Sequence, residues 1–190
     1  MKKLLLLLCF VFIHQVVYPV YFKHLGMSDG LSQVSVMSIY QDCLGRMWFG
    51  TREGVSIYDG ERMRVYKGWE NLDPESSINV LLGHECDHLT GNRQGDIFFR
   101  TCDSLVRYDI RGEKFCVVSG CKAKTITSAD GDIWTGYDDM VCRYDEKGDS
   151  LQLYAKTNTP GISSLLISGK KIWIGTYEGL YVVEEDKKVR

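Results

Sequence analysis

The sequence lacks any long run of charges of one sign and has almost no net charge. Its 23 lysine and arginine residues and 25 aspartate and glutamate residues give a formal net charge of −2. Proteins that bind nucleic acids carry a clustered basic excess, because they neutralise backbone phosphates. The composition therefore argues against a nucleic-acid-binding protein.

The short motifs of common catalytic sites are also missing. The chain contains no G-x-S-x-G nucleophile elbow, no phosphate-binding P-loop and no dinucleotide fingerprint. Carboxylates do cluster at Asp138–Asp139 and Glu184–Asp186, but turn and tail positions explain them better than acid–base catalysis. We therefore expect a protein that is not an enzyme, with no catalytic residues, no cofactor and no metal.

Proline is scarce, whereas glycine and aromatic residues are common. The chain holds 3 prolines against 19 glycines, and 12% of its residues are aromatic, including 11 tyrosines. β-Branched and aromatic residues punctuated by glycine favour short strands and tight turns over helices. The hydrophobic content of 44% and charged content of 25% are those of a globular protein. The composition therefore predicts a folded domain built mainly from strands.

Only one long hydrophobic run is present, and it lies at the N-terminus. Lys2 and Lys3 are followed by an unbroken apolar run over residues 4–13. This run is too short to span a bilayer as a stable helix, and a positive start before an apolar stretch is typical of a secretory signal peptide. We therefore predict a signal peptide over about residues 1–20, cleaved within 15–21, and a periplasmic protein. A buried core strand and an uncleaved anchor are the alternatives.

The seven cysteines are irregularly spaced. Cys9 would leave with the signal peptide, and the others are Cys43, Cys86, Cys102, Cys116, Cys121 and Cys142. An even number in an oxidising compartment permits disulfides, but a chain of this length can build a core without them. We favour buried thiols, which behave as small apolar side chains. A small disulfide loop between Cys116 and Cys121 is the alternative.

A pattern of glycine and aromatic residues recurs along the chain. The anchors of its four copies are Trp48, Phe98, Trp134 and Trp173. A tyrosine–aspartate pair recurs in register at Tyr58, Tyr108 and Tyr144, whereas Tyr181 of the last copy is out of register by two residues. A period of about 40 residues with such marks is typical of a β-propeller.

Each copy has the pattern of one propeller blade. In the first copy, strands are expected over 35–40, 46–50, 55–58 and 62–66, joined by turns rich in glycine and aspartate. We therefore predict an all-β protein, a partial β-propeller of about four blades over residues 21–190, each blade a four-stranded antiparallel meander. The expected blades span about 35–66, 78–115, 121–154 and 161–184. Trp48, Trp134 and Trp173 are expected at equivalent buried positions, where each packs one blade on the next.

A polar stretch interrupts the repeat between the first two copies. It runs from Lys67 to Ser77, contains Pro74 and carries Trp69, the one tryptophan outside the repeat anchors. Insertions of this kind often decorate a binding face, although a neutral surface loop is the simpler explanation. Trp69 is the aromatic residue most expected at the surface, but the sequence assigns no ligand-binding residue.

One stretch matches the H-E-x-x-H signature of zinc proteases. It contains His84, Glu85 and His88, and zinc chemistry needs a helix there so that both histidines reach one metal. The repeat instead places the stretch on the first strand of the second blade. Residues four apart on a strand lie about 13 Å apart, too far to bind one ion together. We therefore predict no zinc site, and polar side chains near the propeller axis.

The repeat resembles the two-component regulator propeller repeat. The match is carried by Ile39–Asp42, by Gly45–Thr51 around Trp48, and by Ile172–Thr176 followed by Gly179-Leu180. The segment Tyr21–Ser32, which ends in Ser-Asp-Gly-Leu-Ser, is similar to the start of such sensors before their first blade. The resemblance covers about residues 21–190 and is looser in the second copy, where Phe98 and Arg100 replace tryptophan and glycine.

The resemblance implies the N-terminal fragment of a periplasmic ligand-sensing propeller in a hybrid two-component sensor, with glycan fragments as ligands. Further blades, a membrane helix and a histidine kinase would belong to the parent protein, so we expect this chain to be truncated. The expected partners are an oligosaccharide in the intact parent, and either the downstream blades or a second copy of the chain; no nucleic acid is expected. The alternative is an exported propeller that serves as a binding or accessory protein, or as an enzyme, unrelated to signalling.

Overall fold

The computed structural model describes residues 20–67, 84–102, 104–118, 120 and 122–184. The predicted signal peptide, Trp69 with most of the inserted loop, and Cys121 lie outside these residues. Among the described residues, no helix has the length and apolar character needed to cross a membrane.

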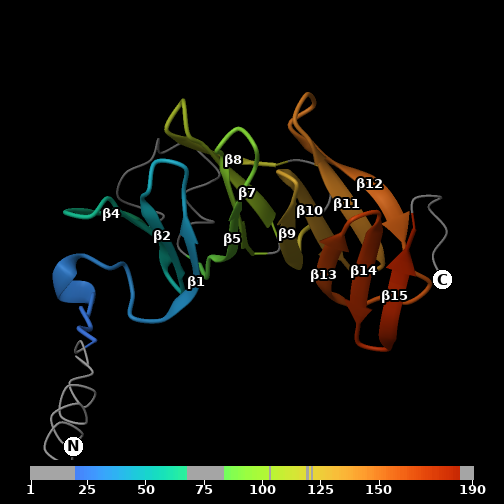
Figure 1. Cartoon of the computed structure of the whole chain (residues 1–190), viewed down its shortest axis with the longest axis horizontal. Coiled ribbons are helices and arrows are strands. Elements are labelled where there is room, and N and C mark those ends of the chain that lie inside the picture. The colour runs from blue at the N-terminus through green and yellow to red at the C-terminus, as the bar shows by residue number, and fades with distance from the viewer. Residues whose placement is uncertain (1–19, 68–83, 103, 119, 121, 185–190) are drawn as a thin grey trace, which may run out of the picture.

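Nearly all regular structure in the described residues is β-strand (Figure 1). One short 3-10 helix, η1 (Met27–Asp29), precedes the strands. The strands are β1 (Val36–Gln41), β2 (Met47–Thr51), β3 (Gly54–Tyr58), β4 (Met63–Tyr66), β5 (Asp87–Gly91), β6 (Ile97–Thr101), β7 (Ser104–Asp109), β8 (Lys114–Val117), β9 (Thr125–Ala129), β10 (Asp132–Tyr137), β11 (Met140–Asp145), β12 (Ser150–Lys156), β13 (Ile162–Ser168), β14 (Lys171–Thr176) and β15 (Gly179–Val183). The predicted all-β fold class is confirmed.

The strands form four antiparallel sheets, one for each copy of the repeat, which we call blades 1 to 4. Blade 1 contains β1–β4, blade 2 contains β5–β8 and blade 3 contains β9–β12, each in chain order. Blade 4 contains β13–β15, so its described part has three strands where four were expected. Residues 185–190, which follow β15, lie outside the described residues.

The first strands of successive blades lie next to one another. Contacts join β1 to β5, β5 to β9 and β9 to β13, so these four strands form an inner edge. The other strands of each blade extend away from that edge, and the blades follow one another in chain order across the molecule (Figure 1). This is the stacking of propeller blades around an axis.

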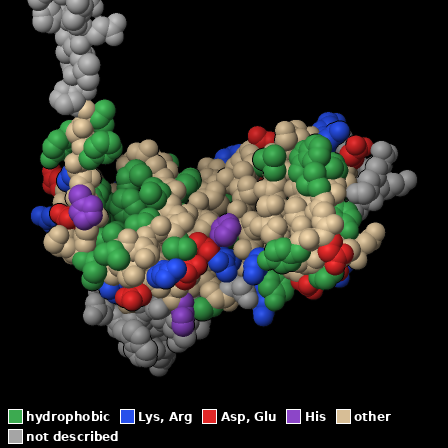
Figure 2. Space-filling model, turned by 90° about the horizontal axis from the view of Figure 1, so that it is seen from below, with side chains coloured by type: hydrophobic (Ala, Val, Ile, Leu, Met, Phe, Trp, Pro, Cys, Tyr) green, Lys and Arg blue, Asp and Glu red, His purple; other side chains and the backbone are tan. Residues whose placement is uncertain are grey.

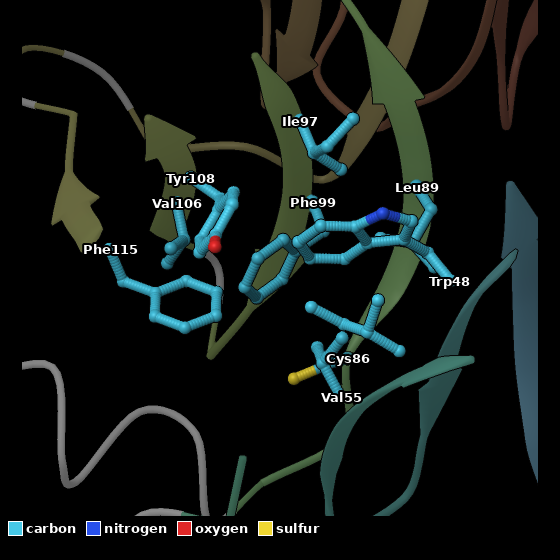
Figure 3. Close-up of a cluster of buried hydrophobic side chains, with 10 residues drawn as sticks. Trp48, Val55, Cys86, Leu89, Ile97, Phe99, Val106, Tyr108 and Phe115 are labelled. Carbon is cyan, nitrogen blue, oxygen red and sulfur yellow. The ribbon is translucent and has the colours of Figure 1, made fainter. Parts of the chain in front are cut away.

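Three clusters of buried side chains hold successive blades together. In the first, the ring of Trp48 from blade 1 meets Tyr108 of blade 2 edge-on, with ring centroids 4.9 Å apart (Figure 3). In the second, Phe98 of blade 2 meets Tyr144 of blade 3 in the same way, also at 4.9 Å. The third places Trp134 of blade 3 against apolar residues of blade 4. Each cluster covers sheet faces that a lone blade would leave exposed to water.

The four aromatic anchors occupy the same place on the second strand of each blade. Trp48 pairs with Ile57, Phe98 with Arg107, Trp134 with Arg143 and Trp173 with Val182. The first three anchors are at most 7% exposed, because the next blade covers them. Trp173 is half-buried, since no following blade lies among the described residues. The predicted equivalence is correct, but the predicted burial is wrong for Trp173.

Glycines on the second strands allow neighbouring blades to approach closely. A Cβ atom at Gly50 would lie 2.4 Å from the carbonyl oxygen of Cys86, and one at Gly136 would lie 2.5 Å from the side chain of Ile162. Both partners belong to the next blade, so a larger side chain would push the blades apart. Blade 2 carries Arg100 at this place, in keeping with its looser similarity to the repeat.

A buried carboxylate ties the first turn of blade 1 to its tryptophan anchor. One oxygen of Asp42 accepts hydrogen bonds from Arg46 Nε at 2.7 Å and Trp48 Nε1 at 2.8 Å. The other accepts the backbone N–H groups of Leu44 and Arg46, both at 2.9 Å. Burial alone would raise the pKa of Asp42, but the hydrogen bonds from Trp48 and Arg46 outweigh it and lower that pKa. The ionised carboxylate is therefore part of the folded structure.

The cysteines of the described residues differ sharply in exposure, and no disulfide joins any two of them. Cys86 and Cys142 are buried, whereas Cys43 and Cys102 are exposed. Burial raises the pKa of the Cys86 thiol to about 12. Because Cys121 is not described, the disulfide alternative that involves it stays a prediction.

We expect N-ethylmaleimide at neutral pH to modify Cys43 and Cys102 in the folded chain and to spare Cys86 and Cys142. The thiolate is the reactive form, and burial both raises its energy and blocks access. Peptide mapping by mass spectrometry reads each site separately, and the same reaction in guanidinium chloride should modify all four. Modification of Cys86 as fast as Cys43 in the folded chain would contradict the packing between blades 1 and 2.

Candidate ligand-binding site

A pocket of about 490 Å³ lies where turns of blades 2 and 3 come together. Its lining comes from the β5–β6 turn, from the β9–β10 turn, and from the β11–β12 hairpin with its flanking strands: Arg93, Gln94, Gly131, Asp132, Arg143, Tyr144, Asp145, Glu146, Lys147, Gln152, Leu153 and Tyr154. Small-molecule sites in proteins commonly have volumes of about 300–1,000 Å³. The pocket is therefore large enough for a small organic ligand.

The backbone holds the two turns against each other. The N–H of Arg93 donates to the carbonyl oxygen of Gly131 at 3.1 Å, which joins the blade 2 turn to the blade 3 turn. A Cβ atom at Gly131 would lie 2.8 Å from the Cβ of Arg93, and its φ of +83° favours glycine. Within the blade 2 turn, Asn92 Oδ1 accepts the N–H of Asp96 at 2.8 Å. The pocket thus has a fixed backbone frame shared by two blades.

The polar side chains of the pocket pair with one another. Gln94 Nε2 donates to Glu146 at 2.6 Å, and this bond crosses from blade 2 to blade 3. An ion pair joins Arg143 to Asp132 at 2.7 Å. Gln152 Nε2 donates to Asp145 at 2.8 Å. One ion pair and two amide–carboxylate hydrogen bonds therefore link the polar side chains of the lining.

Apolar groups form one side of the pocket. The rings of Tyr154 and Trp134 meet edge-on with centroids 4.8 Å apart, and the guanidinium of Arg143 lies 5.6 Å from the centre of the Trp134 ring. Leu153 is 53% exposed. Packing against buried Trp134 limits the movement of both Tyr154 and Arg143, so this wall presents a preformed surface.

A smaller cavity of about 180 Å³ between blades 2 and 3 shares Gln94, Tyr144 and Glu146 with the pocket. Within it, Arg107 of blade 2 bonds to Asp149 of blade 3 at 2.8 Å, and the Tyr144 hydroxyl donates to Asp149 at 2.6 Å. Burial opposes ionisation of Asp149, but the bonds from Tyr144 and Arg107 outweigh it and lower its pKa. This charged network joins the two blades next to the pocket.

A second polar cluster involves the inner strand β5. The carboxylate of Asp87 accepts two hydrogen bonds from Arg100, one of them from Nε at 2.8 Å. His88 Nδ1 lies 2.9 Å from the same carboxylate, although this contact lacks hydrogen-bond geometry. Burial opposes ionisation of Asp87, but His88 and Arg100 outweigh it and lower its pKa. Figure 2 shows a histidine beside charged side chains of both signs near the middle of the face that it views.

The H-E-x-x-H stretch does not form a helix. His84 and Glu85 are exposed and lie outside the regular elements, and His88 has a φ of +53° at a bulge in β5. Within the part of the chain that the structure describes, no three histidine, cysteine, aspartate or glutamate side chains form a group able to hold a metal ion. The geometry that zinc proteolysis requires is therefore not found in these residues.

The chain is similar in sequence to part of a histidine kinase and in structure to an extracellular domain. No protein-family model matches the chain. It is 41% identical to "Histidine kinase P4" from Formosa agariphila over 59 residues, which are 31% of the chain and 4% of that protein. The extracellular domain of a protein described as a hybrid two-component system, BT3049 from B. thetaiotaomicron, superposes with a TM-score of 0.72 and 26% identity. That match covers 88% of the chain and 26% of the domain. The chain therefore resembles the extracellular domain of a hybrid two-component system.

A more distant match shows the fold alone. Virginiamycin B lyase from Staphylococcus aureus has a TM-score of 0.60 and 15% identity over 85% of the chain, which covers 56% of that enzyme. Propeller architecture by itself therefore decides nothing about catalysis, because one fold hosts unrelated functions. This propeller spans about a quarter of the BT3049 domain. The similarity therefore does not by itself assign the activity or the ligands of a longer protein to this chain.

The structure places the carboxylates singled out in the sequence away from the pocket. Asp138 lies in the β10–β11 turn with a φ of +53°, Asp139 pairs with Lys156 at 3.6 Å, and Glu184 pairs with Lys171 at 3.5 Å. Sequence reasoning missed the pocket residues. The available signal was the first turn of blade 2, where Arg93 and Gln94 depart from the turn residues of blade 1.

Proposed function

We propose that this propeller is part of the ligand-sensing region of a two-component sensor outside the cytoplasm, and that its ligand is an oligosaccharide. The observation that carries the sensor assignment is the 26% identity with the extracellular BT3049 domain over 88% of the chain. The N-terminal Lys2-Lys3 followed by an apolar run supports export. In this proposal the propeller binds, and any kinase reaction belongs to another part of the sensor.

The chemistry of the pocket supports an oligosaccharide ligand. A sugar carries many hydroxyl groups, each of which donates and accepts hydrogen bonds. The lining offers amide, carboxylate and guanidinium groups for those hydroxyls, and the pocket also has Leu153 and Tyr154 for the apolar face of a sugar ring. Binding would be non-covalent and would leave the ligand unchanged.

Binding is expected to be measurable on the isolated chain. Isothermal titration of the full chain with a panel of neutral and acidic oligosaccharides should give at least one saturable ligand. A ligand that binds the folded state alone raises the melting temperature, so a thermal-shift assay provides a second readout. If no oligosaccharide binds at millimolar concentration, the ligand part of the proposal is wrong.

The sensor assignment has its own test. The reading frame that continues or adjoins this sequence in its genome should encode further propeller repeats and a histidine kinase. A gene that ends without them, and without a neighbouring kinase gene, would favour the exported binding or accessory propeller instead.

A further inference from the structure

We propose that the pocket between the turns of blades 2 and 3 is the binding site for a short, uncharged oligosaccharide that bridges the two blades. This inference rests on the proposed function for the general class of ligand. It adds the site, the neutral character of the ligand and the consequence for the junction between blades 2 and 3.

The balance of charge in the lining favours an uncharged ligand. Arg143 is neutralised by Asp132 at 2.7 Å, and the carboxylates of Asp145 and Glu146 already accept amide hydrogen bonds from glutamine side chains. The lining carries three cations, Arg93, Arg143 and Lys147, and three carboxylates, Asp132, Asp145 and Glu146, so it has no excess of positive charge to attract an anionic ligand. A neutral polyol adds hydrogen bonds without breaking the existing pairs.

Two amides present unused acceptors to such a ligand. Gln94 and Gln152 each donate through Nε2, and within the described residues neither amide oxygen accepts a hydrogen bond. Both side chains are exposed, so a ligand reaches them without local unfolding. An amide oxygen and the neighbouring carboxylate both accept hydrogen bonds, so adjacent hydroxyls of one sugar ring can each donate to one of them.

The bridging role follows from the origin of the lining. Gln94 comes from blade 2, whereas Gln152 comes from blade 3. The Gln94–Glu146 bond and the Arg93–Gly131 backbone bond already cross this junction, and the network around Asp149 lies next to it. A ligand held by both amides adds further links across the same junction, and therefore opposes separation of the two blades.

The test uses the full chain and the neutral tetrasaccharides of cellulose, starch and mannan, with tetragalacturonate as the acidic probe. The double substitution Gln94→Ala and Gln152→Ala should weaken binding of the neutral probe about tenfold or more, because it removes two exposed hydrogen-bonding groups. Gln41→Ala is the matched control, since Gln41 is also an exposed glutamine in a blade but lies outside the pocket. Hydrogen exchange should slow on ligand binding in both the β5–β6 turn and the β11–β12 hairpin.

The possible results separate the two proposals. Binding of a neutral probe that the double variant loses and Gln41→Ala keeps supports the site. Binding that the double variant retains places the site elsewhere and overturns this inference, while the proposed function stands. Preference for tetragalacturonate, lost in the double variant, overturns the neutral ligand. Failure of every probe to bind the wild-type chain overturns both the inference and the oligosaccharide part of the proposed function.

Discussion

Replacing Trp48 by alanine is expected to lower the free energy of unfolding by about 3–5 kcal/mol, the usual cost of truncating a fully buried large aromatic residue. Trp48 is 0% exposed and packs against Tyr108 of the next blade at 4.9 Å (Figure 3). The substitution leaves a cavity at the first junction between blades, where the surrounding β-sheets cannot close in. Urea unfolding followed by circular dichroism measures the loss without relying on the tryptophan signal.

Trp173→Ala is the matched control, because Trp173 holds the equivalent place in blade 4. It is only half-buried, so its replacement should cost roughly 1–2 kcal/mol of area-based burial energy. Similar losses in the two variants would contradict the assignment of Trp48 as a contact between blades. A loss for Trp173→Ala that grows with protein concentration would instead indicate that a second copy covers this tryptophan.

The face of blade 4 that carries Trp173 shows why the spacing of the repeat predicts where a residue lies in its blade better than it predicts whether that residue is buried. Leu166, Trp173 and Val182 lie side by side across the three strands of blade 4, and Leu166 is 60% exposed. In blades 1 to 3 the next blade covers the aromatic anchor on the same face. The repeated residues encode a surface suited to a neighbouring blade, whereas the burial of that surface depends on whether a following blade packs on it.

The fold was predictable because each copy of the repeat contains the residues that determine how its blade packs against the next one. Glycine at positions 50 and 136 permits close approach of the next blade, and the tryptophan anchors fill the junctions between blades. In blade 4, where Tyr181 is out of register, Val183 takes the place that the repeat gives to the tyrosine. These constraints act between neighbouring blades, so a period of about 40 residues was sufficient to recover them.

The pocket was not predictable in the same way, since it depends on contacts between turns that the repeat does not specify. Arg93 reaches Gly131 only because the Asp130–Gly131 turn has positive φ at both residues. The spacing of the aromatic anchors does not determine the distance between the turns of neighbouring blades. Turn residues that differ between copies indicate where function resides, but they do not indicate which turns meet.

Asp42→Ala is expected to cost about 3–5 kcal/mol, the range for removing one partner of a buried charge pair. The carboxylate of Asp42 is fully buried, and its loss leaves the Arg46 guanidinium without its ion-pair partner and the Trp48 N–H without an acceptor. Arg46 depends strongly on this contact, because one of its Nη atoms is buried without a partner among the described residues. Asp42→Asn should cost less, since an amide oxygen keeps an acceptor for Trp48.

The lowered pKa of Asp42 also predicts how the free energy of unfolding changes with pH. The pKa of Asp42 is lower in the folded chain than its ordinary value, so its ionised form stabilises the fold above a pH of about 4 and this contribution is lost as the pH falls through the folded pKa. Urea unfolding from pH 7 down to pH 2.5 should therefore show a steeper loss for the wild-type chain than for Asp42→Asn, which has no proton to take up at this position. Curves that stay parallel over the whole range would contradict an ionised, hydrogen-bonded Asp42 beneath Trp48. The carboxylate that begins the repeat would then be a turn residue alone, with no part in holding the first aromatic anchor.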